Sequence, residues 1–305
     1  MEQLNLQRAK PSQVPLSTGG VSETSDERLD EERHYIYRSC VASLLYIAHD
    51  FPTALHAIRV LACDVQAPTI TNWQKLKKVA RYLAGIAKQG HFFPRTRDSG
   101  DVTLLQVFTD SDWAGDKGSR KVVVVRYCAA GAVLCLYAAV HGQTIHAQSS
   151  GEAEFYGGVS GISSALGAKH AMEFLGISTK IEVRLDSSSA RGILNRQGVG
   201  KIRHLAVKAL WCQDIVRQGL ITIKPVPGVK NIADIGTKAL TGSRLDELAS
   251  MMGVMSKADA MRTGDEQSRN DDININPGVS AIEDIKMRTT SIIADKLMQH
   301  LLIRA

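Results

Sequence analysis

The stretch VFTDSDWAGD, residues 107–116, joins an apolar segment to three carboxylates. Asp110, Asp112 and Asp116 follow one another closely, directly after the apolar residues. An ionised carboxylate is costly to bury unless a cation or a set of hydrogen-bond donors compensates its lost hydration. Aspartate is also common in the polar turns that end strands. The stretch alone therefore leaves two interpretations open, a cation-binding strand end and an ordinary turn.

Three further acids occupy similar places in the sequence. Asp186 ends the alternating stretch IEVRLD, Glu154 lies in the first turns of a predicted helix that opens with SSGEAEF, and Asp234 lies in the first turn of NIADIGTK. Each alone has an ordinary explanation, because an aspartate can form an Asx turn and a negative charge is favourable at a helix N-terminus. Four acids at strand ends and helix starts together favour one shared site.

The elements that must position these acids follow from hydrophobic periodicity, which changes from helical to extended near Gly100. Strands are predicted at TLLQVFTD, at KVVVVRYC with AGAVLCLY, at QTIHAQS, at IEVRLD and at LITIKPVP. Helices are predicted at 149–176, 187–197, 203–219 and 231–240. The order predicts an α/β fold, a mixed five-stranded sheet with flanking helices, preceded by a small helical segment.

The sequence divides into four parts by composition. Residues 1–30 are polar and predict a disordered linker, and 31–98 predict a helical segment. Within it, Thr71 is the expected N-cap of a helix whose apolar stripe runs from Trp73 to Leu83. Residues 99–242 carry the sheet, and 243–305 form a polar tail that ends in a candidate amphipathic helix.

Composition and charge narrow the class of protein. The 305 residues carry a formal net charge of +6, which is compatible with a polyanionic partner. Five scattered cysteines, none in a C-x-x-C pair, disfavour a disulfide framework or a zinc site. Neither a membrane-spanning run nor a signal-peptide core is present. We therefore expect an intracellular protein, cytoplasmic or nuclear, without a membrane partner.

The quoted motifs resemble the ribonuclease H region of a copia-type retrotransposon Pol polyprotein. The most specific pieces are TDSDWAGD, SGEAE and ADIGTKAL, and the likeness extends over residues 25–245. Residues 31–98 resemble the segment that connects the reverse transcriptase of that family to its ribonuclease H. The family's polymerase palm carries a paired Asp-Asp between apolar residues, whereas the one Asp-Asp of this chain, Asp271-Asp272, lies in the polar tail. Polymerisation is therefore not predicted, and the chain resembles the C-terminal piece of a polyprotein.

The resemblance implies which acids form the site. Ser149 and Glu152 fit a capping box, and Glu154 lies about 200° further round the helix, so the two glutamates cannot face one site equally. The family's helix glutamate aligns with Glu154. Asp110, as the last residue of its predicted strand, is preferred to Asp112. The implied catalytic and metal-binding residues are Asp110, Glu154, Asp186 and Asp234.

The implied reaction is hydrolysis of the RNA strand of an RNA/DNA hybrid by two-metal-ion catalysis. Four carboxylates would repel one another unless cations neutralise them, and oxygen ligands suit two Mg²⁺ or Mn²⁺ ions. Such ions lie about 4 Å apart in two-metal sites. The expected contacts to nucleic acid are Asn195, Arg196, Lys201, Arg203, His204 and Lys208. A reverse transcriptase palm, on a separate chain or in the parent polyprotein, is a second candidate partner.

Two other functions remain open. The chain could be a non-catalytic nucleic-acid-binding remnant of a retroelement polyprotein that keeps the carboxylates without turnover. It could also be an integrase-like nuclease of the same fold, although that triad usually ends in a glutamate on a late helix, where this chain has Asp234.

Overall fold

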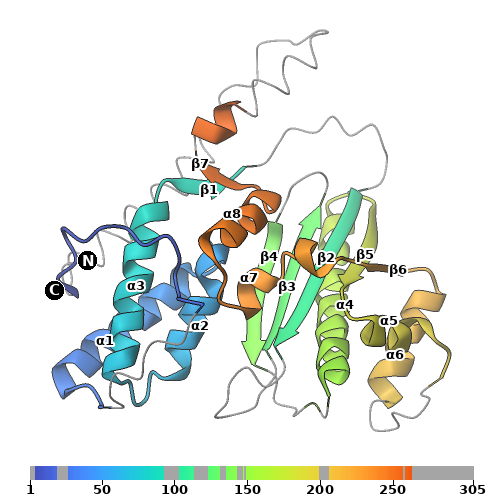
Figure 1. Cartoon of the computed structure of the whole chain (residues 1–305). Helices are drawn as coiled ribbons and strands as arrows, with labels where there is room; N and C mark the ends of the chain where they lie inside the picture. The colour runs from blue at the N-terminus through green and yellow to red at the C-terminus, as the bar shows by residue number, and fades with distance from the viewer. Residues whose placement is uncertain are drawn as a thin grey trace. The chain divides into compact units, whose positions relative to one another are not determined.

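The computed structural model in Figure 1 describes residues 4–18, 27–92, 103–112, 123–130, 135–142, 147, 149–198, 206–256 and 258–262. The chain forms two compact units. Unit 1 comprises Met1–Phe92, Ala239–Ser250 and Val254–Ala305, and unit 2 comprises Phe93–Lys238 and Met251–Gly253. All four acids of the predicted site belong to unit 2.

Unit 2 is built on one mixed sheet (Figure 1). Its strands are β2 (Thr103–Asp112), β3 (Val123–Ala130), β4 (Cys135–Gly142), β5 (Thr179–Leu185) and β6 (Ile221–Pro225). They are ordered β4-β3-β2-β5-β6, with β2, β3 and β4 antiparallel and with β5 and β6 parallel to β2. The predicted ribonuclease H-like arrangement, a mixed five-stranded sheet with flanking helices, is confirmed.

The helices of unit 2 cover the sheet and its ends. They are α4 (Ser150–Phe174), α5 (Ser188–Asn195), α6 (Ala206–Arg217) and the short α7 (Asp234–Thr237), which follows the 3-10 turn Gly228–Lys230. The long helix α4 lies along β2 and β5, and α7 contacts β2, β3 and β4 (Figure 1). The core between α4 and the sheet includes Leu105, Val107, Phe155, Ile162, Ile181, Val183 and Leu185, all fully or nearly fully buried. This packing fixes α4 relative to the two central parallel strands.

Two glycines allow α4 to approach the sheet closely. A Cβ at Gly161 would lie 2.5 Å from Cγ2 of Thr109 and 3.2 Å from Cγ1 of Val107. A Cβ at Gly158 would lie 3.2 Å from Cδ2 of Leu185. Larger side chains at these positions would therefore push the helix away from β2 and β5.

Unit 1 is largely helical. It contains α1 (Glu31–Ile47), a 3-10 turn (Pro52–Ala54), α2 (Leu55–Cys63), α3 (Ile70–Ile86) and most of α8 (Gly242–Met251), and β1 (Gln89–His91) pairs with β7 (Val254–Ser256). As the predicted stripe requires, Leu76, Val79 and Leu83 are buried. The N-cap is Thr69 and not Thr71, because the side chains of Thr69 and Asn72 complete a capping box two residues earlier.

The structure differs from the sequence-based expectations at both ends of the chain. Residues 4–18 were expected in a disordered linker, yet Leu4, Leu6 and Leu16 are buried, because a few leucines can pack even where the average composition is polar. The stretch 243–305 was expected to be a polar tail, yet it supplies most of α8 and all of β7. The candidate C-terminal helix at 281–305 lies outside the described residues. The other domain bounds stay predictions.

The strands also differ in extent from the prediction. β2 continues past Asp110 to Asp112, because β3 pairs with it as far as the Asp112–Val123 register. The third strand is β4, and the stretch QTIHAQS, expected in its place, lies mostly outside the described residues. No helix in the described parts of the chain is both long and apolar enough to cross a membrane.

Candidate active site

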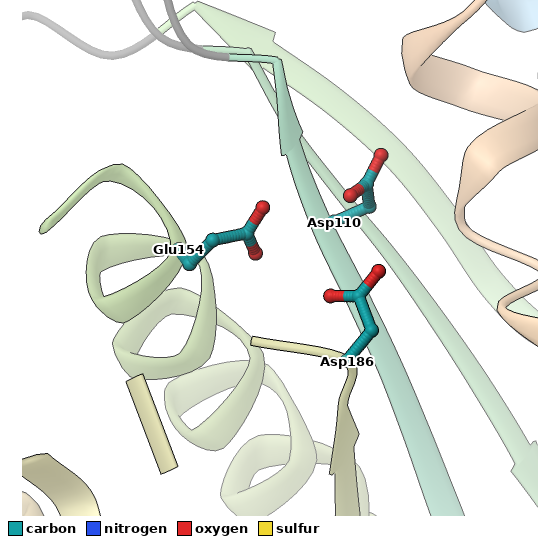
Figure 2. A group of neighbouring side chains, drawn as sticks. All are labelled: Asp110, Glu154 and Asp186. Atoms are coloured by element: carbon teal, nitrogen blue, oxygen red, sulfur yellow. The ribbon is translucent and has the colours of Figure 1, made fainter. Parts of the chain in front are cut away.

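Three carboxylates from three different elements converge at one end of the sheet. Asp110 of β2, Glu154 of α4 and Asp186, directly after β5, each offer one oxygen, and these oxygens all lie within 4.8 Å of one another. Figure 2 shows the three side chains pointing toward a common centre. Asp110 is buried, and the other two side chains are half-buried. The predicted convergence of these three acids is therefore present in the structure.

Strand register explains why Asp110 and Asp186 meet. β2 and β5 are adjacent and parallel, and their last registered pair is Phe108 with Arg184. Asp110 and Asp186 each follow that pair by two residues, so they lie side by side at the same edge of the sheet. In parallel pairs the carboxyl ends of both strands lie at one edge, which makes this edge the natural place for a site.

Hydrogen bonds to the backbone fix the turn that carries Asp186. Ser187 is the N-cap of α5, and its hydroxyl accepts a hydrogen bond from the backbone N–H of Ala190. The guanidinium of Arg191 donates to the carbonyl oxygens of Leu185 and Asp186, at 2.8 Å each. These contacts leave the carboxylate of Asp186 itself without a basic partner among the described residues.

The start of α4 positions Glu154. Ser149 is the N-cap, as predicted, and its hydroxyl accepts a hydrogen bond from the backbone N–H of Glu152. Glu152 is buried beside Tyr156, whose pKa is raised by burial and by the charge of that glutamate. Glu154 points instead toward Asp110 and Asp186 (Figure 2). The two glutamates therefore have different surroundings, as the helical geometry predicts.

Burial and neighbouring charge perturb Glu154 strongly. One of its oxygens, Oε2, is buried and has no hydrogen-bond partner among the described residues. Burial, followed by the charges of Asp110 and Asp186, raises the pKa of Glu154 to about 8, and Ser111 beside it acts in the opposite direction. Near neutral pH this carboxyl is therefore largely protonated unless a cation compensates the cluster.

A second group of side chains holds Asp110 from the side of α7. The hydroxyl of Thr237 donates a hydrogen bond to Oδ2 of Asp110. The ammonium of Lys238 lies 3.4 Å from the same oxygen and 2.6 Å from Oδ1 of Asp234. Burial raises the pKa of Asp234, and Lys238 offsets part of that rise. Burial opposes charge on Lys238, but Asp110 and Asp234 outweigh it and raise the pKa of its ammonium.

Asn231 connects this segment to β2. It is fully buried, its amide donates to the carbonyl oxygen of Thr109 at 3.2 Å, and its side-chain oxygen accepts from the backbone N–H of Ala233 at 3.2 Å. The residue before Asp110 and the residue before Asp234 are therefore held by one side chain.

The predicted site residues do not all meet at one place. Asp110, Glu154 and Asp186 form the carboxylate cluster, and Asp234 lies outside it, across the ammonium of Lys238. Of the expected nucleic-acid contacts, Asn195 ends α5, Arg196 caps it, and Lys208 lies on α6 with its ammonium 4.6 Å from the centre of the Tyr156 ring. The remaining three, Lys201, Arg203 and His204, lie outside the described residues.

Sequence reasoning did not single out Asn231, Thr237 or Lys238. All three lie in the quoted motif NIADIGTKAL, so their place was visible, but their roles depend on contacts to β2. The spacing of Asp234 and Lys238, one helical turn apart, was the available signal for an ion pair.

The residues present fit a divalent cation. Three carboxylates within 4.8 Å of one another offer hard oxygen ligands of the kind that Mg²⁺ and Mn²⁺ prefer. A bound cation would also give a partner to the buried Oε2 of Glu154. The identity of the ion does not follow from this geometry.

The raised pKa of Glu154 predicts an unusual dependence of stability on pH. In the unfolded chain the carboxyl ionises near its ordinary 4.5, whereas in the folded, metal-free chain it keeps its proton to about 8. The folded state therefore binds more protons between these values, and its stability should fall as pH rises through them. Glu154→Gln should abolish most of this fall, as measured by urea unfolding in EDTA from about pH 5 to about pH 8.

Glu173→Gln, near the other end of α4, is the matched control, because Glu173 is half exposed and pairs with Lys169. In this control the free energy of unfolding should fall with pH as steeply as in the wild-type chain. An equally steep fall in Glu154→Gln would contradict the raised pKa of Glu154. Binding of Mn²⁺ should tighten over the same pH range in the wild-type chain, because a ligating glutamate must lose its proton.

Comparisons with known proteins agree with the resemblance seen in the motifs. The chain is 24% identical over 265 residues to the retrovirus-related Pol polyprotein from transposon TNT 1-94 of Nicotiana tabacum, covering 84% of this chain and 19% of that polyprotein. It is 27% identical over 277 residues to the Pol polyprotein from transposon RE1 of Arabidopsis thaliana, covering 82% and 17%. A shorter match, to that from transposon RE2, is 34% identical over 113 residues, covering 37% and 7%. No family model matches.

The chain spans less than a fifth of the length of these polyproteins. Among solved structures, the N-terminal ribonuclease H domain of Rv2228c from Mycobacterium tuberculosis, fused to maltose-binding protein, covers 48% of this chain and 97% of that chain, with a TM-score of 0.34 and 18% identity. The fold assignment therefore rests on strand order and register. Over most of the chain, its relatives are retrovirus-related Pol polyproteins from transposons, as the motifs predict.

Proposed function

We propose that this chain, whose relatives over most of its length are transposon Pol polyproteins, is a ribonuclease H that hydrolyses the RNA strand of RNA/DNA hybrids. The observation that carries the proposal is the convergence of Asp110, Glu154 and Asp186 at the carboxyl edge of the two central parallel strands. A structural role alone does not account for three carboxylates held together with a buried, unpartnered oxygen on one of them.

The three clustered carboxylates are the residues that would hold a catalytic Mg²⁺ or Mn²⁺. When bound, such a cation lowers the pKa of water and stabilises negative charge on a phosphodiester. Asp110 is fixed by the hydroxyl of Thr237, and the turn of Asp186 is fixed by Arg191. Glu154 is carried by a helix packed tightly on the sheet. Held in this way, the carboxylates need little reorganisation to bind a cation.

The fourth acid, Asp234, is proposed to complete a two-ion site during the reaction. The ammonium of Lys238 lies between the carboxylates of Asp234 and Asp110, so these two carboxylates would hold the second ion between them. In two-metal hydrolases the paired ions serve the attacking and the leaving oxygen of an in-line displacement.

Selection of a hybrid requires contacts that distinguish an RNA strand from DNA. Recognition of 2′-hydroxyls across a wide minor groove is the chemistry that would do so. Asn195, Arg196 and Lys208 on α5 and α6 are the proposed phosphate contacts, together with Lys201, Arg203 and His204 between these helices. The net charge of +6 is compatible with this polyanionic ligand. A reverse transcriptase palm in the parent polyprotein is the proposed protein partner, in the cytoplasm or nucleus.

The test is a cleavage assay with purified protein on a hybrid whose RNA strand is labelled, in Mg²⁺, in Mn²⁺ and in EDTA. The RNA strand should be cut in the presence of either ion and remain intact in EDTA. Duplex DNA of the same sequence should remain intact, because it offers no 2′-hydroxyls. Hybrid binding should weaken steeply as salt rises, because phosphate contacts release counterions.

Two other outcomes would support the alternative functions. Hybrid binding without cleavage in Mn²⁺ at low salt would favour a non-catalytic nucleic-acid-binding remnant. Equal cutting of duplex DNA would favour an integrase-like nuclease of the same fold.

A further inference from the structure

The ammonium of Lys238 occupies the place between two of the four acids. Its Nζ is 2.6 Å from Oδ1 of Asp234 and 3.4 Å from Oδ2 of Asp110. The other two acids, Glu154 and Asp186, form no ion pair with any described Lys or Arg. The ammonium that pairs with carboxylates of the site therefore lies on the side of α7, whereas the guanidinium of Arg191, at the turn of Asp186, contacts carbonyl oxygens.

Asp110 therefore belongs to two sets of acids. It shares the ammonium of Lys238 with Asp234, and it also forms the carboxylate cluster with Glu154 and Asp186, which have no such cation among the described residues. An ammonium and a divalent ion cannot occupy the same space between two carboxylates, and like charges close together repel strongly at a partly buried site.

We propose that Lys238 is a positioning residue whose ammonium takes the place of a second cation in the free chain, so that one divalent ion binds at Asp110, Glu154 and Asp186. The second ion, beside Asp234, enters only after that ammonium has moved away. The inference rests on the proposed function, because it concerns the ions of the same site.

The exposure of the three side chains shows which of them can move. The Lys238 side chain is 48% exposed, whereas those of Asp110 and Asp234 are 3% and 14% exposed. The backbone N–H of Lys238 donates to the carbonyl oxygen of Asp234 and so holds its main chain at the end of α7. The lysine side chain can therefore rotate into solvent while both carboxylates stay in place.

The decisive measurement is electron paramagnetic resonance of the full chain with Mn²⁺ and without nucleic acid. Two Mn²⁺ ions about 4 Å apart, the separation of two-metal sites, are magnetically coupled and give a signal distinct from that of isolated ions. The wild-type chain should give isolated Mn²⁺ only, with one ion per chain in the site. Lys238→Met should give the coupled signal, and bound Mn²⁺ in the site should rise twofold.

Three further variants make the result specific. Lys224→Met removes an exposed lysine of β6 and should resemble wild type, which controls for the general loss of positive charge. Lys238→Arg keeps the charge and should also give isolated ions. Asp234→Asn combined with Lys238→Met should lose the coupled signal, because the second ion has lost its ligand. Circular dichroism establishes that each variant is folded, and Lys238→Gln replaces Lys238→Met if the latter does not fold.

A coupled pair in the wild-type free chain would overturn the inference and leave the proposed function standing. So would a folded, neutral Lys238 variant that shows isolated ions alone. Failure of wild type and all variants to bind Mn²⁺ above the level of Asp110→Asn would overturn both this inference and the metal-dependent function.

Discussion

Asp186→Asn is expected to abolish hybrid cleavage without weakening the fold. The substitution removes one of three clustered carboxylates. Loss of a residue that only holds a metal ligand in place lowers metal affinity or activity about 10- to 100-fold, and loss of a ligand itself should cost more. We therefore expect cleavage to fall by more than about 100-fold. Among the described residues the side chain of Asp186 has no basic partner, so its neutralisation relieves repulsion with Asp110 in the metal-free chain, and with Glu154 as well once the pH exceeds the raised pKa of that glutamate. Stability in EDTA should rise or stay unchanged.

The measurements are single-turnover cleavage of the labelled hybrid and urea unfolding in EDTA. Asp214→Asn is the matched control, because Asp214 is a half-exposed acid of α6 whose ion pair with Arg217 should contribute little. It should leave both quantities near wild type. Wild-type cleavage by Asp186→Asn would remove Asp186 from the site, and marked destabilisation in EDTA would show that its charge is compensated.

The structure makes Asp110→Asn a less informative substitution. Asp110 accepts a hydrogen bond from Thr237 and contacts the ammonium of Lys238. Its neutralisation therefore removes both favourable and unfavourable interactions, and the sign of its effect on stability depends on their balance. Asp186 separates catalysis from stability more cleanly.

Asn231→Leu is expected to destabilise unit 2 more than any substitution on its surface. It leaves the carbonyl oxygen of Thr109 and the backbone N–H of Ala233 unpaired in a fully buried place. Each such buried group costs about 1–3 kcal/mol. Leucine branches at the same carbon as asparagine, but it is larger and cannot replace either hydrogen bond. Urea unfolding measures the loss, and cleavage should fall with it, because Thr237 and Lys238 follow on the same segment.

Asn231→Asp separates the two hydrogen bonds. Aspartate still accepts from the N–H of Ala233 but cannot donate to the carbonyl oxygen of Thr109. At neutral pH this variant should therefore be destabilised both by the lost hydrogen bond to Thr109 and by the burial of one more negative charge. Asn195→Leu, at an exposed helix end, should change stability little and serves as the control. Full stability of Asn231→Leu would mean that the segment carrying α7 is not held by Asn231.

The acids of the site were predictable because local context marks them. Asp110 and Asp186 end apolar, alternating stretches, and Glu154 follows an N-cap serine. Their convergence follows once the two strands are taken as parallel neighbours. Lys238 was not predictable in the same way, because its partner Asp110 is 128 positions earlier in the sequence and belongs to a different element. Contacts across the fold leave no periodic signal.

Element bounds were predictable only approximately, for a related reason. The end of β2 depends on its pairing with β3, and the N-cap of α3 depends on which of two nearby threonines meets Asn72. The stretch that carries the buried Leu4, Leu6 and Leu16 is hydrogen-bonded to Arg81 of α3, far along the sequence. In each case a partner distant in the sequence, or a choice between equivalent local residues, decides the outcome.

The hydrogen bonds of Asn231 and Thr237 join residues 122 and 127 positions apart in the chain. Closing loops of this length costs entropy before any contact compensates it, so such contacts form late in folding. Of the site, only the contacts of Asp234, Thr237 and Lys238 wait for this last segment to dock on β2. The three clustered carboxylates, by contrast, meet as soon as α4 packs on β2 and β5. Their mutual repulsion therefore opposes the assembly of the helix with the central strands, and the ammonium of Lys238 arrives only afterwards to offset part of it.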